Sequence, residues 1–207
     1  MASSIDYYFT SISPFSYLGH KTLMEISSRT GAAVNFMPFD LFGVWENSGA
    51  VPPAKRPPLR QRYRLVELQR VAAMRNTCLN PKPAHFPTDP SLADHCICAL
   101  AKSGSDPATF VFEAGRAVWE RDLQIADEAV IKELLKECGH DAELVLEQAA
   151  SPEIAAVRQS NTEAAKASDA VGAPAYVYEE EVFWGQDRLE YLEQMIVSGR
   201  KAFQSDL

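Results

Sequence analysis

The 207-residue sequence lacks several features, and each absence excludes a class of protein. It has no run of about 20 apolar residues, the length that a membrane-spanning helix needs. Its first residues show no basic region followed by an apolar run, so we expect no secretory signal and a cytoplasmic location. Acidic residues outnumber basic ones by 28 to 20, and the net charge of −8 argues against nucleic-acid and anionic-membrane partners.

Cysteine is scarce and carries no redox motif. The four cysteines are Cys78, Cys96, Cys98 and Cys138, and none of them forms a Cys-x-x-Cys pair. Only His95 lies close to two of them, which is too few ligands for a metal ion. We therefore expect no metal site, and we expect buried or half-buried reduced thiols.

The first 39 residues have the pattern of a strand, a helix and a second strand. Residues 5–10 are aromatic and β-prone, and residues 34–39 form a second such run. Between them, Ser13-Pro14 is a helix-start signal, apolar residues recur at helical spacing, and Gly31 is a natural C-cap. The connection is long enough for a right-handed parallel crossover.

The middle of the chain is rich in helix-favouring residues, and strand character returns only near the end. Residues 47–58 predict a loop and 59–75 a helix, with further breaks at 81–90, 103–107, 122–127, 139 and 151–152. Residues 175–178 and 181–184 predict a tight antiparallel hairpin. Asp187 can cap a last helix from Arg188 to about Lys201.

This order predicts an α/β protein of the thioredoxin-like fold, β-α-β … β-β-α, with an inserted all-helical domain. We expect residues 1–41 and 169–207 to form the discontinuous thioredoxin-like domain. We expect residues 42–168 to form the inserted helical domain.

Ser13 has two interpretations that the residues alone leave open. Ser-Pro is an ordinary N-cap and first-turn pair that stabilises a helix by about 1 kcal/mol. A hydroxyl at a helix N-terminus also favours an anion, and it can donate a hydrogen bond to a bound thiolate. Ser13 and Ser16 stand where thioredoxin-like redox proteins carry the two cysteines, so this motif cannot exchange disulfides.

The chain resembles the 2-hydroxychromene-2-carboxylate isomerases and the kappa-class glutathione transferases over nearly its whole length. The matching segments are residues 6–9, 13–19, 39–43, 48–49, 52–55, 83–87, 171–174 and 184–189. In sequence the most specific of these are Ser-Pro-Phe-Ser-Tyr-Leu-Gly near the start, and Val-Gly-Ala-Pro and Trp-Gly-Gln-Asp-Arg-Leu near the end. The helical middle matches loosely.

The resemblance implies glutathione as the cofactor and Ser13 as the catalytic serine that contacts its sulfur. It implies that Pro174 is cis, and that Ala173 before it pairs with the tripeptide backbone. It implies that Gln186 and Asp187 contact the γ-glutamyl end. Two residues are implied as substrate contacts, Phe15 and Lys55, although Lys55 can also be an ordinary exposed loop lysine. Members of the family are commonly dimers, so a homodimer is expected.

The implied reaction is the glutathione-dependent cis–trans isomerisation of an aromatic, carboxylate-bearing electrophile with a conjugated carbonyl. Two alternatives stay open, namely a kappa-like glutathione transferase or peroxidase and a non-catalytic thioredoxin-like binding protein. The chain departs from the family at Ala50, where kappa-class enzymes have asparagine. It departs again at Thr88-Asp89-Pro90 and at Asp94-His95-Cys96, where many isomerases have Asn-Thr/Ser and a later arginine. In the family these positions lie near the substrate pocket rather than at the glutathione site.

Overall fold

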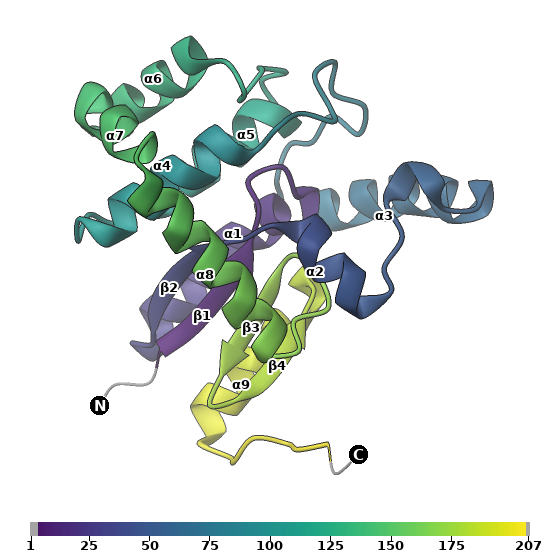
Figure 1. Ribbon diagram of the computed structural model, residues 1–207. Coiled ribbons are helices and arrows are strands. Elements are labelled where there is room, and N and C mark those ends of the chain that lie inside the picture. The colour runs from purple at the N-terminus through teal and green to yellow at the C-terminus, as the bar shows by residue number, and fades with distance from the viewer. Residues whose placement is uncertain (1–3, 206–207) are drawn as a thin grey trace.

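A four-stranded mixed sheet forms one half of the molecule (Figure 1). The computed structural model describes residues 4–205, apart from the side chain of Asn47. The strands are β1 (Ser4–Phe9), β2 (Ala33–Pro38), β3 (Ala175–Tyr178) and β4 (Glu181–Trp184). They lie in the order β2-β1-β3-β4, with β1 and β2 parallel and the other two pairings antiparallel. The central strand β1 therefore joins segments from both ends of the chain.

Some of the helices cover the two faces of the sheet, and the remaining helices stack beyond one end of it (Figure 1). The helices of the first half are α1 (Pro14–Thr30), α2 (Leu41–Ser48), α3 (Pro58–Met74) and α4 (Ser91–Lys102). Those of the second half are α5 (Ala108–Trp119), α6 (Glu128–Glu137), α7 (Ala142–Ala149), α8 (Pro152–Ala167) and α9 (Leu189–Ser198). Two single 3₁₀ turns complete the set, Pro53–Lys55 and Gln186–Arg188.

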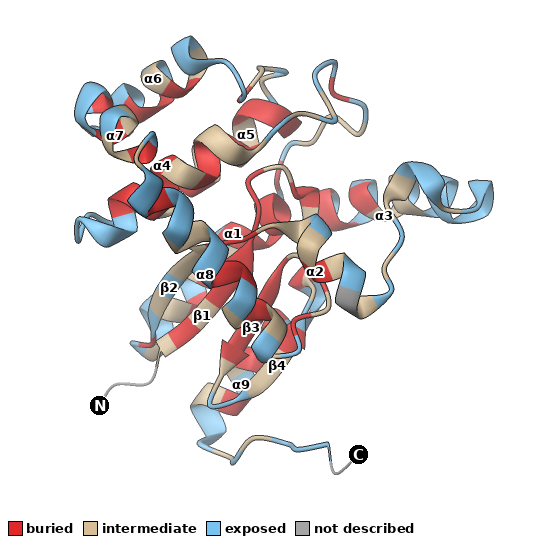
Figure 2. Ribbon diagram, viewed as in Figure 1, coloured by how far each residue is buried: buried red, intermediate tan, exposed pale blue. Residues whose placement is uncertain are grey.

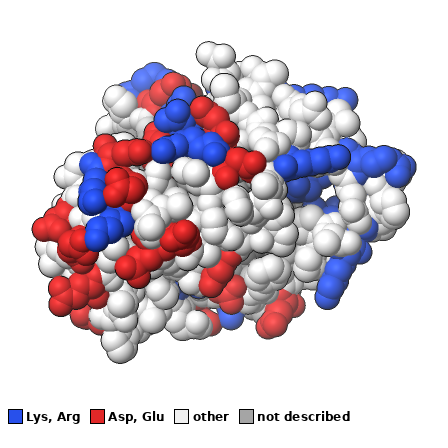
Figure 3. Space-filling model, turned by 90° about the horizontal axis from the view of Figure 1, so that it is seen from above, with Lys and Arg blue, Asp and Glu red and all other residues white. Residues whose placement is uncertain are grey.

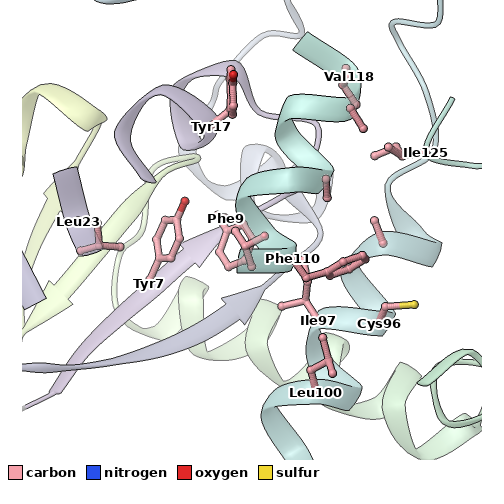
Figure 4. Close-up of a cluster of buried hydrophobic side chains, with 14 of the residues drawn as sticks. Tyr7, Phe9, Tyr17, Leu23, Cys96, Ile97, Leu100, Phe110, Val118 and Ile125 are labelled. Atoms are coloured by element: carbon pink, nitrogen blue, oxygen red, sulfur yellow. The ribbon is translucent and has the colours of Figure 1, made fainter. Parts of the chain in front are cut away.

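The sheet packs against helices on both faces because side chains alternate along each strand. On β1, Tyr7 and Phe9 point into the larger apolar core, which continues into the helical block. Tyr8 points the other way, into a smaller cluster with residues of α2 and α8. Figure 4 shows the Phe9 side chain directed toward Phe110 and Ile97, which come from α5 and α4. Figure 2 shows the buried residues concentrated in the sheet and on the inner faces of these helices.

The predicted order of elements is confirmed, with two local corrections. Helix α2 extends to Ser48, and a 3₁₀ turn lies at Pro53–Lys55, so the predicted loop at 47–58 is partly helical. The prediction that Asp187 caps the last helix is wrong. Asp187 lies inside the 3₁₀ turn, and α9 begins after Arg188 without a side-chain cap. The terminal residues 1–3 and 206–207 of the predicted domain boundaries lie outside the described residues.

Candidate functional site

Ser13 caps the start of helix α1, and the cap does not use its O–H donor. Its backbone is extended, with φ −78° and ψ 118°, and its Oγ accepts a hydrogen bond from the Ser16 N–H at 3.2 Å. Pro14 follows in the first helical turn, where a missing N–H costs nothing. A hydroxyl has two acceptor lone pairs and one O–H donor, and capping uses only a lone pair. The O–H of this buried side chain is therefore free to donate elsewhere.

The late strand β3 brings its preceding proline to this helix start. Strand pairing places Tyr8 of β1 opposite Ala175 of β3, so the segments next to these residues meet. The Ala173–Pro174 peptide bond is cis. The Ser13 Oγ donates to the Ala173 carbonyl at 3.4 Å, across 160 residues of sequence. That separation is at the long limit for a hydrogen bond, so the O–H is only weakly engaged.

Gln186 is brought to α1 by a close backbone approach. A Cβ added at Gly19 would lie 2.8 Å from the Gln186 Cβ, so only glycine allows this packing. Gln186 is buried, with a side chain that accepts a hydrogen bond from Arg75. Asp187, in contrast, is exposed and pairs with Arg188 at 3.2 Å. The carboxylate of Asp187 is therefore open to a ligand cation, whereas Gln186 is held by the protein.

The two predicted substrate contacts differ in where they lie. Phe15 is two residues after Ser13 in α1 and is half-buried against the main core. Lys55 is exposed at the end of its 3₁₀ turn, and within residues 4–205 no hydrogen bond or ion pair joins its side chain to Ser13 or Gln186. Figure 3 shows Lys and Arg gathered at the end of the molecule where α3 lies. Arg60, Arg62, Arg64 and Arg70 all belong to α3, and Lys55 precedes this helix in the chain.

Three further residues at the site were not predicted as site residues, although Asp94 was named as part of a departure from the family. Arg75, at the end of α3, donates to Gln186 through Nε and Nη2, both at 2.9 Å, and pairs with Glu190 at 2.7 Å. Asp94 of α4 and Arg158 of α8 form an ion pair at 3.1 Å beside the Ser13 loop. An aspartate inside the apolar run of α4 is the one signal that could have found this pair. Arg75 has no such signal, because it continues an arginine-rich helix.

A cavity of about 360 Å³ opens next to the same loop. Its lining includes Thr10 and Ile12 from the loop, Leu41 and Phe42 from α2, and Arg158 from α8. Thr88-Asp89-Pro90, one of the departures from the family, also lines it. The cavity is therefore bounded by both the sheet half and the helical block.

The four thiols do not all match their prediction. Cys96 and Cys98 are buried, and burial raises the pKa of each thiol to about 12. Cys138 is half-buried, with its pKa raised by burial to about 11. The prediction is wrong for Cys78, which is exposed because it lies in the loop after α3 rather than inside a packed helix.

Residues 4–205 contain no group of three or more His, Cys, Asp or Glu side chains arranged to hold a metal ion. None of the helices in this part of the chain is both long and apolar enough to cross a membrane.

Comparisons with known proteins agree with this architecture. The family model of the DSBA-like thioredoxin domain matches residues 4–197. The chain is 30% identical to a 2-hydroxychromene-2-carboxylate isomerase of Sphingobium xenophagum, over 95% of this chain and 100% of the relative. It is 25% identical to glutathione S-transferase kappa 1 of Caenorhabditis elegans, over 93% of this chain and 90% of the relative.

A solved structure shows the same fold. The structure of a 2-hydroxychromene-2-carboxylate isomerase superposes with a TM-score of 0.80 at 24% identity, covering 94% of each chain. The predicted thioredoxin-like fold with a helical insert is thereby confirmed. The chain belongs to the family of DSBA-like thioredoxin domains, and its relatives in that family include isomerases and a kappa-class glutathione transferase.

Proposed function

We propose that this protein is a glutathione-dependent cis–trans isomerase acting on an aromatic, carboxylate-bearing substrate with a conjugated carbonyl. The observation that carries the proposal is the Ser13 hydroxyl. It caps α1 with a lone pair, while its O–H rests on a long contact of 3.4 Å to the Ala173 carbonyl. A sulfur anion at this helix start would offer that O–H a stronger, charge-assisted hydrogen bond. The isomerase relative at 30% identity supports the same reaction.

Three parts of glutathione have suitable partners among the residues present. Ala173 sits before a strand, and within residues 4–205 no acceptor pairs with its backbone N–H. This N–H is therefore available to the carbonyl of an extended peptide. The exposed Asp187 carboxylate suits the γ-glutamyl ammonium group. The N-terminus of α1 and the Ser13 O–H suit a thiolate.

Glutathione, when bound, supplies the nucleophilic sulfur that adds reversibly to the conjugated substrate. The protein positions glutathione and stabilises the negative charge on its sulfur. Ser13 donates its O–H to the sulfur and thereby favours the thiolate over the thiol. Ala173 and Asp187 align the tripeptide, and Arg75 holds the Gln186 turn that carries Asp187. The adjoining cavity is the space for the substrate. Phe15 and Lys55 do not line that cavity, and their substrate contacts stay predictions of the resemblance.

The substitution Ser13→Ala tests the proposal. Loss of a hydrogen bond to a charged group should lower kcat/KM for a glutathione-dependent reaction by about 10- to 100-fold. It should also cost about 1 kcal/mol of stability through the lost cap. Ser28→Ala, an exposed serine on the same helix, is the matched control and should leave the rate unchanged. An unchanged rate in Ser13→Ala would show that the hydroxyl has no catalytic role.

Two alternatives use the same site differently. A kappa-like transferase or peroxidase would consume glutathione, whereas an isomerase returns it free, so product analysis separates them. The kappa-class relative supports this alternative. A non-catalytic binding protein would show neither reaction. If calorimetry detects no heat of binding when the protein is titrated with millimolar glutathione, this alternative is favoured. The domain boundaries, the homodimer and the cytoplasmic location stay predictions.

A further inference from the structure

The carboxylate of Asp94 is buried among hydrogen-bond donors from the loop that precedes Ser13. Asp94 is 0% exposed. Its Oδ1 accepts hydrogen bonds from the Ser11 N–H at 2.9 Å and the Ser11 hydroxyl at 2.8 Å. Its Oδ2 accepts from the Thr10 hydroxyl at 3.2 Å and from Arg158 Nη2 at 3.1 Å. Three of these four donors belong to two consecutive loop residues.

These bonds tie the Ser13 loop to the helical block. Asp94 lies in α4, 83 residues from Ser11 in sequence. The loop also closes on itself, because the Ser13 N–H donates to the Thr10 carbonyl at 3.0 Å. Thr10 is therefore fixed by its side chain to α4 and by its carbonyl to Ser13. A movement of Asp94 would be passed to Ser13 through a single turn of backbone.

Arg158 is the countercharge that makes this arrangement possible. Burial raises the pKa of Asp94, while Arg158 and the two bonds from Ser11 oppose that rise. The Arg158 guanidinium also donates to the Phe39 carbonyl at 3.4 Å, and its Nε is buried without a partner among the described residues. Arg158 comes from α8, so the cluster joins three separate segments of the chain. Thr10 and Arg158 also line the cavity beside the site.

We propose that Asp94 is a positioning residue for Ser13, acting through Thr10 and Ser11, with Arg158 as its countercharge. Asp94 fixes where the Ser13 hydroxyl and the first turn of α1 stand relative to the cavity. It touches neither the cofactor nor the reacting atoms. The proposal rests on the proposed function only in taking Ser13 as the group that holds the thiolate.

The variant Asp94→Asn tests the anchoring of the loop without any ligand. Asparagine keeps an oxygen for Ser11 but turns an NH₂ group toward the donors of Arg158 and Thr10. Hydrogen exchange of the Ser11 and Ser13 amides should become faster by about tenfold or more, because bonds to a charged acceptor are weakened. The exchange rates of the β3 amides should not change. Asp141→Asn, an exposed helix cap elsewhere, is the matched control. Unchanged exchange at Ser11 and Ser13 would overturn the anchoring.

A second measurement separates positioning from plain stability. The pKa of bound glutathione, followed by the ultraviolet absorbance of its thiolate, should rise in Asp94→Asn by about one unit, the equivalent of one lost hydrogen bond. In a Ser13→Ala background the same substitution should add no further rise, because Asp94 acts through Ser13. An equal rise in both backgrounds would overturn the proposal.

Failure to bind glutathione and failure of the variant to fold are distinguishable outcomes. If the wild-type protein takes up no glutathione, the proposed function fails, while hydrogen exchange still decides whether Asp94 anchors the loop. If Asp94→Asn does not fold, Thr10→Val and Ser11→Ala carry the same tests, since each leaves the Asp94–Arg158 ion pair intact. Both should raise the thiolate pKa, by less than Asp94→Asn. No rise in either would overturn the proposal.

Discussion

Arg75→Met should destabilise the protein strongly, because Arg75 supports a buried turn rather than a surface pair. The Arg75 side chain is 10% exposed and makes two hydrogen bonds to Gln186, which is itself 4% exposed. Methionine keeps most of the apolar stem and removes the guanidinium. The variant therefore removes both hydrogen bonds to Gln186 and leaves its buried side-chain oxygen without its donor.

The loss of stability expected in Arg75→Met follows from these contacts. A hydrogen bond from a charged donor is worth about 1.5 kcal/mol at the low end, so the two to Gln186 give about 3 kcal/mol. The third contact, with Glu190, adds little because that carboxylate is 56% exposed. The expected loss in the free energy of unfolding is about 3 kcal/mol. Since Gln186 and Asp187 share one 3₁₀ turn, glutathione affinity should fall as well.

Urea denaturation of the wild type and variant measures this loss directly. Arg29→Met is the matched control, because Arg29 also forms an ion pair at 2.8 Å, with Glu193, but is 53% exposed. An exposed pair of this kind contributes less than about 1 kcal/mol. If Arg75→Met costs no more than Arg29→Met, the reasoning about the Gln186 turn is refuted.

Two further predictions concern titration and thiol chemistry. Two hydrogen bonds from Arg200, at 2.6 and 2.8 Å, hold the pKa of Glu181 below its ordinary range. This lowered pKa stabilises the fold at neutral pH, and the stabilisation is lost as the pH falls through the folded-state pKa. Glu181→Gln should therefore flatten the acid side of a stability–pH curve, and an unchanged slope would contradict this. Cys78 should react first with an aromatic disulfide reagent, because it is exposed while the α4 thiols are buried with raised pKa values. Cys78→Ser should remove the fast phase, and a fast phase that persists would show that another thiol is accessible.

Local signals predicted most of the elements because each depends on neighbours in the sequence. Ser13-Pro14 and Gly31 mark the observed ends of α1, since capping uses residues within one turn of the helix. The prediction for Asp187 failed because tertiary packing overrode the same local rule. The chain there forms a 3₁₀ turn against α1, where Gly19 permits close contact with Gln186.

The sequence by itself determined the alternation of strands and helices, the resemblance to a family, and Ser13 as the residue at the first helix start. These follow from side-chain periodicity and from motifs read along a continuous chain. The resemblance placed Ser13 and Ala173 at one glutathione site. Only the tertiary structure decided that the Ser13 hydroxyl bonds the Ala173 carbonyl directly, that Arg75 holds Gln186, and that Asp94 reaches the loop before Ser13. Each of these contacts joins segments more than 80 residues apart. Such contacts form because packing of the sheet and helices brings the segments together, and no local pattern encodes that approach.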